Sequence, residues 1–260
     1  MVVHPTDQWL EKAYHSPEQM FKKLTRYFTH STPEEIASLL TYHGMYKKPS
    51  LKKEDLLRQL RERKVWEIIK KEEQLLKQKW NGRNVSIFIF PSNTNDRKIS
   101  QHYNGKSGLA FIDKLFLFIS QENSEQELKA LFTHEYNHCC RLLHAPKSER
   151  KYHLLDVVIL EGLAENAVQE RFGPDYLAPY TGYYSKQELE SIWEKIIQPN
   201  KELPKTSSKA NAILYGKNLY PKMAGYAVGY YLVNRYVQEN GVNSLDLLTL
   251  PAEKIAQLNT

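Results

Sequence analysis

Two histidines and a glutamate stand close together in residues 133–138, THEYNH. His134 and His138 are four residues apart, so on a helix they lie one turn apart on the same face. This separation lets two imidazoles bind one zinc ion, and the pattern His-Glu-x-x-His puts Glu135 in the position of a general base. Because so short a pattern also arises by chance, it needs support from the elements around it.

The helix that carries this motif is predicted independently. Ser124 and Glu127 form a capping box, and Pro146 prevents extension much beyond Leu143. Glu135 falls within the apolar stripe of this helix. A buried carboxylate is expected to have a polar partner or a functional role, because its desolvation costs free energy. The alternative is a glutamate at the edge of the stripe that reaches solvent. The apolar members of the stripe are Leu128, Leu131, Phe132, Cys139 and Leu142.

A second helix, predicted from about Leu154 to Phe172, offers the missing ligand. It is apolar on nearly all sides, yet it carries Glu161 and Glu165 one turn apart. A catalytic zinc commonly has three protein ligands, so we expect Glu161 to join the two histidines. Glu165 is predicted to accept a hydrogen bond from a liganding histidine and so fix its tautomer. Ordinary ion pairs with Lys or Arg are the alternative for both acids.

The cysteines, Cys139 and Cys140, are adjacent in sequence. Neighbouring helical residues point about 100° apart, so we expect no disulfide between them and a reducing cytoplasm as the location. Cys139 projects away from the histidine face, which favours a small buried hydrophobe over a zinc ligand. We also expect neither a signal peptide nor a transmembrane span, because the apolar runs are short and interrupted by charge.

HEYNH followed by LEGLAE resembles the gluzincins, and with the later AGYAVGYYLV it is similar to the YjaZ-like family of predicted zinc-dependent proteases in bacilli. The resemblance runs from about Leu56 to the end of the chain. It implies a peptidase that holds one Zn²⁺ and takes its third ligand from a downstream helix. In thermolysin-like gluzincins an Asn precedes the ligand Glu and an Asp follows four residues later. Here Leu160 and Glu165 stand at those places.

In the mechanism that this resemblance implies, zinc activates water and the substrate carbonyl while Glu135 moves the proton. The developing oxyanion needs a further donor. We expect Tyr230 in this role, with Tyr226 as the substitute and His153 or His144 as outside candidates. A plain core or surface role is the alternative for any one of the 17 tyrosines.

Three short segments read as strands: residues 84–90, the run LAFID and the run LFLFIS. Peptide substrates of such enzymes usually bind extended along an exposed sheet edge. We expect this edge at Gly108, Leu109 and Ala110, where small residues let a peptide backbone approach. A hairpin turn explains Gly108 equally well.

The predicted architecture is α+β and predominantly helical, zincin-like, with a small mixed sheet of three or four strands packed on the HExxH helix. We expect a helical segment over residues 1–82 and a metallopeptidase domain over 83–260, or one continuous compact body. Further helices are predicted after a cap at Thr32, from Ser50 to Trp80, after a cap at Ser185, and from about Ala224 to Glu239.

The charge of +6 equals the excess of 12 basic over 6 acidic residues between Lys47 and Trp80. Because the signs interleave there, a solvated helix face is favoured over a nucleic-acid patch. The leading hypothesis is an intracellular peptidase acting on peptides or unfolded proteins, with no membrane partner. The second is a non-catalytic zinc-binding scaffold or stress-related protein, and nucleic-acid binding ranks last. The sequence leaves the oligomeric state open.

Overall fold

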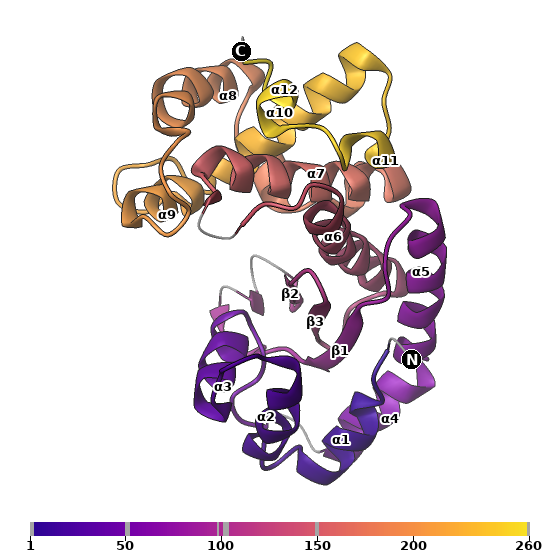
Figure 1. The fold of residues 1–260 in the computed structure, drawn as a ribbon. Coiled ribbons are helices and arrows are strands. Elements are labelled where there is room, and N and C mark those ends of the chain that lie inside the picture. The colour runs from indigo at the N-terminus through magenta and orange to yellow at the C-terminus, as the bar shows by residue number, and fades with distance from the viewer. Residues whose placement is uncertain (1–2, 50–52, 98, 101–103, 149–150, 259–260) are drawn as a thin grey trace. The chain divides into compact units, whose positions relative to one another are not determined.

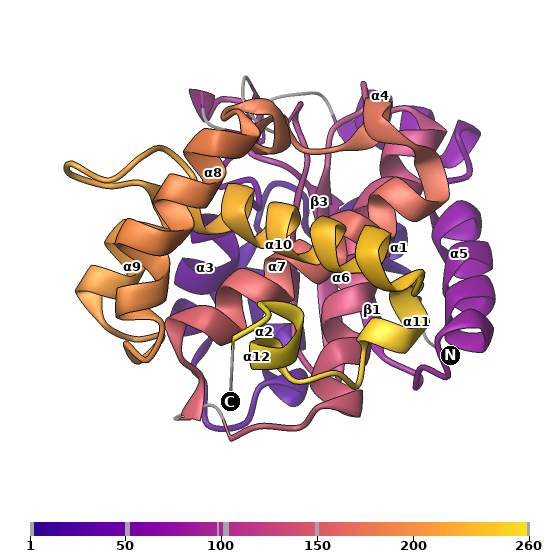
Figure 2. The same cartoon turned by 90° about the horizontal axis from the view of Figure 1, so that it is seen from above.

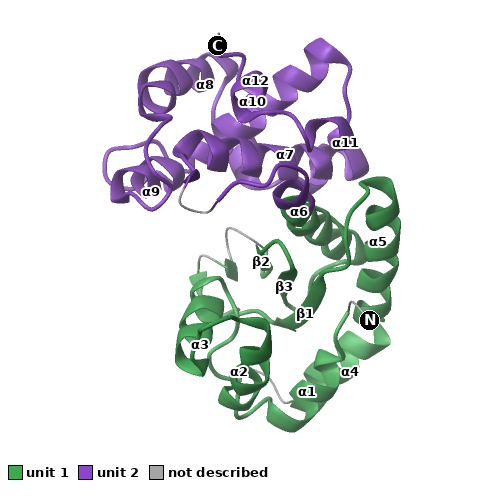
Figure 3. Ribbon diagram, viewed as in Figure 1, with its two compact units in different colours: residues 1–139 green, residues 140–260 purple. Residues whose placement is uncertain are grey.

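The computed structural model describes residues 3–49, 53–97, 99–100, 104–148 and 151–258. Its chain forms two compact units, Met1–Cys139 and Cys140–Thr260 (Figure 3). The division falls inside one continuous helix, α6 (Glu125–His144). A domain boundary after residue 82 therefore stays a prediction. The secondary structure is mostly helical with one small mixed sheet, as the sequence predicts.

The first unit begins with helices. The predicted cap at Thr32 is confirmed at the start of α3, where the Glu35 amide donates to Thr32 Oγ1 at 3.2 Å and the Thr32 amide donates to Glu35 Oε2 at 2.9 Å. This reciprocal pair satisfies two amides that the helix itself leaves without an acceptor. The helices are α1 (Thr6–Ala13), α2 (Glu18–Leu24), α3 (Pro33–Tyr42), α4 (Lys53–Glu62) and α5 (Val65–Lys79).

The single long helix predicted from Ser50 to Trp80 is wrong. Residues 50–52 lie outside the described residues, and the rest forms two helices, α4 and α5. The break lies at Lys64, whose φ of 53° is left-handed. Apolar spacing continues through the break because Leu60 and Val65 are both buried. The periodicity therefore does not reveal a turn made by charged residues without glycine or proline.

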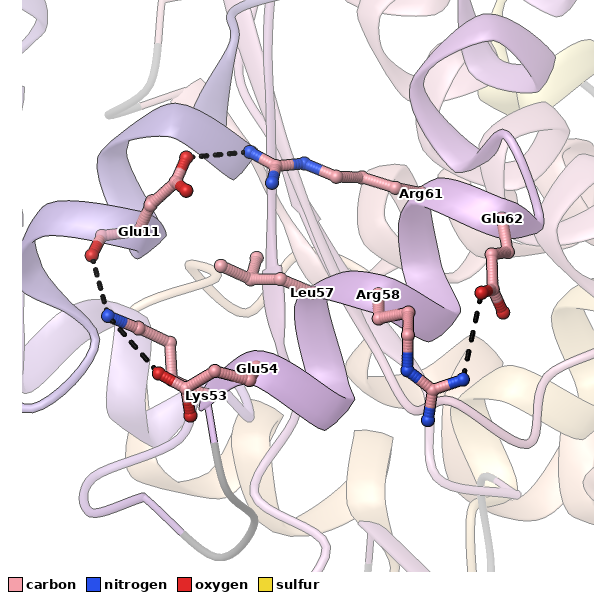
Figure 4. Close-up of a pocket in the computed structure, with 7 residues that line it drawn as sticks. All are labelled: Glu11, Lys53, Glu54, Leu57, Arg58, Arg61 and Glu62. Atoms are coloured by element: carbon pink, nitrogen blue, oxygen red, sulfur yellow. Dashed lines mark hydrogen bonds and ion pairs between the residues drawn. The ribbon is translucent and has the colours of Figure 1, made fainter.

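Charged side chains hold α4 against α1 (Figure 4). Arg61 donates to Asp7 at 3.1 Å and to Glu11 at 2.9 Å, while Lys53 Nζ donates to the Glu11 carbonyl at 3.2 Å. The pocket drawn in Figure 4 is lined by Leu57 and six charged residues, among them Glu11, Lys53 and Arg61. These ion pairs account for part of the basic charge between Lys47 and Trp80.

The sheet has three strands in the order β1-β3-β2, with bounds β1 (Ser86–Pro91), β2 (Ser107–Ala110) and β3 (Lys114–Ile119) (Figure 1). β3 is central, since it pairs parallel with β1 and antiparallel with β2. β2 is an edge strand of the described sheet, and substrate binding at residues 108–110 stays a prediction.

The two faces of the sheet differ in chemistry. The pairs Phe88↔Phe116 and Phe90↔Phe118 put phenylalanines on one face, and the Phe88 and Phe116 rings stack at 4.9 Å. Alternate positions carry aliphatic residues on the other face, including the pair Ile89↔Leu117. Gly108 lies opposite Leu117, so it belongs to the aliphatic face.

The second unit is helical and is built around α7 and α10, which pack side by side (Figure 2). Its core is a continuous cluster of buried apolar side chains from all of its helices. The Glu188 amide donates to Ser185 Oγ, which confirms the predicted start of α8. No helix within the described ranges is long and apolar enough to cross a membrane. The helices are α7 (Leu154–Phe172), α8 (Lys186–Ile192), α9 (Ser208–Tyr215), α10 (Ala224–Asn240), α11 (Ser244–Leu247) and α12 (Ala252–Ile255).

Candidate metal centre

The start of α6 is held by hydrogen bonds to residues that directly precede β2. Glu127 completes the predicted capping box with Ser124, and its carboxylate also accepts hydrogen bonds from Lys106 at 2.8 Å and from Asn104. Burial raises the pKa of Glu127, but these hydrogen bonds outweigh it and lower the pKa to about 2. The carboxylate is therefore ionised at neutral pH and anchors the first turn of the helix.

Two turns further along α6 lies the His-Glu-x-x-His segment. The His134 and His138 rings lie one turn apart with centroids separated by 4.8 Å and planes at 89°. His138 is buried and His134 is half-buried. Glu135 is only 7% exposed, which confirms that a carboxylate falls within the buried stripe of this helix.

Glu135 faces the edge strand β2. A methyl group built on Gly108 would lie 2.4 Å from both Cδ and Oε1 of Glu135. Farther along the helix, Cys139 Sγ lies 4.0 Å from the Lys114 carbonyl at the start of β3. Glu135 and Cys139 therefore both lie against the sheet, although the two residues have different chemistry.

The second helix predicted from the sequence is present as α7, over the expected residues Leu154–Phe172. Most of its residues are buried, in agreement with its apolar composition. Glu161 is half-buried and Glu165 is almost fully buried. Glu165 accepts hydrogen bonds from the Ala178 amide and from the Tyr180 hydroxyl, the latter at 3.1 Å. Its predicted role as a partner of a liganding histidine stays a prediction.

Close packing of α7 on α10 fixes the turn that carries both acids. A Cβ built on Gly162 would lie 2.1 Å from the Gly229 carbonyl oxygen, and one built on Gly229 would lie 2.1 Å from the Val158 carbonyl oxygen. Asn166 Nδ2 adds hydrogen bonds to the Gly162 and Tyr230 carbonyls at 2.9 and 3.1 Å. The backbones therefore touch at a point where neither helix has room for a side chain.

His134, His138 and Glu161 form a group that could hold a metal ion, because each offers a ligand atom and these atoms all lie within 4.8 Å of one another. Two imidazole nitrogens and one carboxylate oxygen are a donor set that suits Zn²⁺ and leaves a coordination position for water. The residues present therefore fit the ion that the sequence predicts.

Comparisons with known proteins place the chain in a family. A family described as "Predicted Zn-dependent protease (DUF2268)" matches residues 65–257. The chain belongs to this family. It is 39% identical over 258 residues to the uncharacterized protein YjaZ of Bacillus subtilis (strain 168), with 97% of each chain covered. The uncharacterized protein YjfC of the same organism is 21% identical over 186 residues, which are 67% of this chain and 61% of YjfC. No solved structure matches this chain.

Membership of the DUF2268 family confirms the resemblance to YjaZ-like predicted zinc proteases.

The two tyrosines considered as oxyanion donors differ in their surroundings. The Tyr230 hydroxyl donates to Gln169, and burial followed by the charge of Glu165 raises its pKa. Burial raises the pKa of Tyr226 well above its ordinary value, and the charge of Glu161 raises it further. The catalytic role of either tyrosine stays a prediction.

Other candidates from this DUF2268 sequence have their own surroundings. His153 precedes α7, and its Nδ1 lies 3.5 Å from Glu202, while His144 is the last residue of α6. Cys139 and Cys140 are both buried, and neither forms a disulfide among the described residues. These positions fit the expected role of the cysteines as small buried hydrophobes.

Two contacts in this region have no signal in the sequence. Tyr180 and the Ala178 amide hold Glu165, but they lie at a short 3-10 helix, η5 (Pro179–Gly182), between α7 and α8, which is too short for a periodic signal. The contact of Gly108 with Glu135 is the second, because the sequence suggests only a substrate-binding edge or a hairpin turn at Gly108. Neither contact has a signature in residue spacing.

Proposed function

We propose that this chain hydrolyses peptide bonds, with His134, His138 and Glu161 holding one Zn²⁺ and Glu135 acting as general base. The group of three ligand atoms within 4.8 Å of one another is the observation that carries this proposal. Membership of a family of predicted Zn-dependent proteases supports it. The substrates are peptides or unfolded protein segments.

A bound zinc ion would supply Lewis acidity to the scissile carbonyl and to the attacking water. Glu135 lies between the two histidines in sequence and accepts the proton of that water, then delivers it to the leaving amine. Because Glu135 is almost fully buried, its carboxylate is confined to few rotamers, which favours the orientation that proton transfer needs.

For the oxyanion we propose Tyr226 ahead of Tyr230. The charge of Glu161 contributes to the raised pKa of Tyr226, so this phenol lies near a proposed metal ligand. Like any tyrosine whose pKa is about 10 or higher, it is protonated at neutral pH, as a hydrogen-bond donor must be. Both hydroxyls already have a partner, since Tyr226 is hydrogen-bonded to Tyr215 and Tyr230 donates to Gln169, but Tyr230 is influenced by Glu165 and not by Glu161.

For the substrate we propose an extended peptide along the outer edge of β2. This strand pairs on one side with β3, and all four of its residues are partly exposed. An added strand would gain main-chain hydrogen bonds there. Gly108, Leu109 and Ala110 are the residues that it would contact.

The test compares Glu135→Gln with the parent protein. Zinc content, measured by mass spectrometry of purified protein, should be unchanged, while cleavage of a peptide library should fall about 10²–10⁴-fold. The matched control is Glu34→Gln, which changes an exposed residue of α3 in the same way. Undiminished cleavage by Glu135→Gln would exclude the mechanism.

The same measurements separate the enzyme from a zinc-binding scaffold. Stoichiometric zinc without cleavage of any library peptide by the parent protein would favour the scaffold. We also propose a cytoplasmic location, and the thiols of Cys139 and Cys140, which form no disulfide in the described part of the chain, are compatible with it. Fractionation of expressing cells would test it.

A further inference from the structure

Gly108 occupies a position in β2 where any side chain would collide with Glu135. Its Cβ would lie 2.4 Å from Cδ and Oε1 of the carboxyl group and 2.5 Å from Cγ. Carbon atoms in favourable contact are separated by ~3.5–4.0 Å. Gly108 is also absent from the glycines with positive φ, so its backbone does not require glycine. Glycine at position 108 therefore provides space for a neighbouring side chain, and its backbone freedom is not used.

A second contact fixes which residue of the strand meets Glu135. Lys106 pairs with Glu127 at 2.8 Å, and Glu127 lies two helical turns before Glu135. Residues two apart on an extended chain point to the same side, so Lys106 and Gly108 both face α6. The Lys106–Glu127 ion pair and the backbone pairing Gly108↔Leu117 therefore agree on the alignment in which Gly108 lies against Glu135.

We propose that Gly108 is a positioning residue for the general base. Its missing side chain leaves the space in which the Glu135 carboxylate lies, and the neighbouring backbone of β2 limits where that carboxylate can move. The catalytic consequence rests on the proposed function, whereas the steric relation between the two residues does not.

Gly108→Ala separates this role from a purely structural one. The colliding atoms Cγ, Cδ and Oε1 all belong to a side chain and none to backbone, so the fold can accept a methyl group while this side chain shifts by about 1 Å to restore normal contact. A shift of this size in a catalytic group costs on the order of 100-fold in rate. We expect kcat to fall by about that factor, while KM, zinc content and the melting temperature stay close to those of the parent.

The matched control is Gly182→Ala. Gly182 has an ordinary φ, and nothing lies within 4 Å of a Cβ built on it. This variant should keep the parent kcat, which shows that the effect at position 108 is local. A crystal structure of metal-free Gly108→Ala supplies a readout independent of activity, and the Glu135 carboxylate should be displaced in it.

Three results would overturn the proposal: an unchanged kcat for Gly108→Ala, a raised KM with unchanged kcat, or an undisplaced carboxylate. The second would mean that position 108 acts only through its proposed contact with the substrate and does not position Glu135. If Gly108→Ala does not fold, Glu135→Ala is added to it, and recovery of folding supports the collision while continued unfolding overturns it. If the parent protein cleaves nothing, the proposed function fails, but the metal-free crystal structure still decides the steric relation.

Discussion

The His134–His138 turn of α6 and the Glu161–Glu165 turn of α7 each carry proposed ligands, but they are held in place differently. The histidine turn follows a capped helix start and lies beside an edge strand with a glycine at the contact. The glutamate turn depends on direct backbone contact between two helices at Gly162 and Gly229. The first turn is held by contacts between a strand and the helix that follows it in the chain. The second is held by the crossing of two helices whose contacting residues are far apart in sequence.

This difference predicts how each turn responds to change. A side chain added beside α6 meets the flexible end of Glu135, so it should alter chemistry more than stability. A side chain added between α7 and α10 meets backbone, so it should alter stability and ligand position together. The following predictions test this contrast in order of decreasing effect.

The largest effect is expected from Glu161→Gln. Removing a direct ligand should weaken zinc binding by more than the ~10–100-fold typical of residues that only orient a ligand. Because Glu161 is half-buried, the melting temperature of the metal-free protein should change little. Competition with a chelating dye measures the affinity. The control is Glu194→Gln, at an exposed position, and equal zinc affinity in the two variants would exclude Glu161 as a ligand.

Gly229→Ala should cost about 3 kcal/mol of unfolding free energy or more, because its Cβ would overlap the Val158 carbonyl and force the helices apart. Urea denaturation followed by circular dichroism measures this cost. Gly182→Ala is again the matched control. A stability loss below 1 kcal/mol for Gly229→Ala would contradict the close crossing and would remove the contrast between the two turns.

Glu165→Gln should destabilise the protein by ~1–3 kcal/mol, because the neutral amide cannot accept two hydrogen bonds from Ala178 and Tyr180 as well as a carboxylate can. Chemical denaturation gives the loss. The zinc affinity of the same variant, measured separately, tests whether Glu165 also orients a histidine ligand. A fall of ~10–100-fold supports a role in orienting a histidine, whereas an unchanged affinity leaves Glu165 as an anchor of residues 174–182 alone.

The smallest effect concerns Glu127. Its pKa is lowered to about 2 from an ordinary value of 4.5, so its contribution to stability is present above pH 4.5 and is lost as the pH falls through 2. The side chain is partly exposed, so the contribution is about 1 kcal/mol. Thermal unfolding of the parent and of Glu127→Gln should differ at pH 7 and converge near pH 2. A constant difference over this range would contradict the assignment.

Local patterns predicted the helices of the site closely. Capping residues and apolar periodicity located α6 and gave the observed bounds of α7, because both signals act within one element. The same reasoning failed at Lys64, where the chain turns without glycine or proline. A break of that kind is stabilised by the packing of α4 and α5, which sequence spacing does not contain.

The sequence by itself determined the types of ligand and their spacing, since the helical repeat alone puts His134 and His138 one turn apart. It also determined that Glu161 and Glu165 share one buried helix. Only the tertiary structure decided that Gly108 makes room for Glu135, that Gly162 and Gly229 let two backbones touch, and that Tyr180 holds Glu165. These contacts join residues from separate elements, so their geometry exists only after the chain has packed.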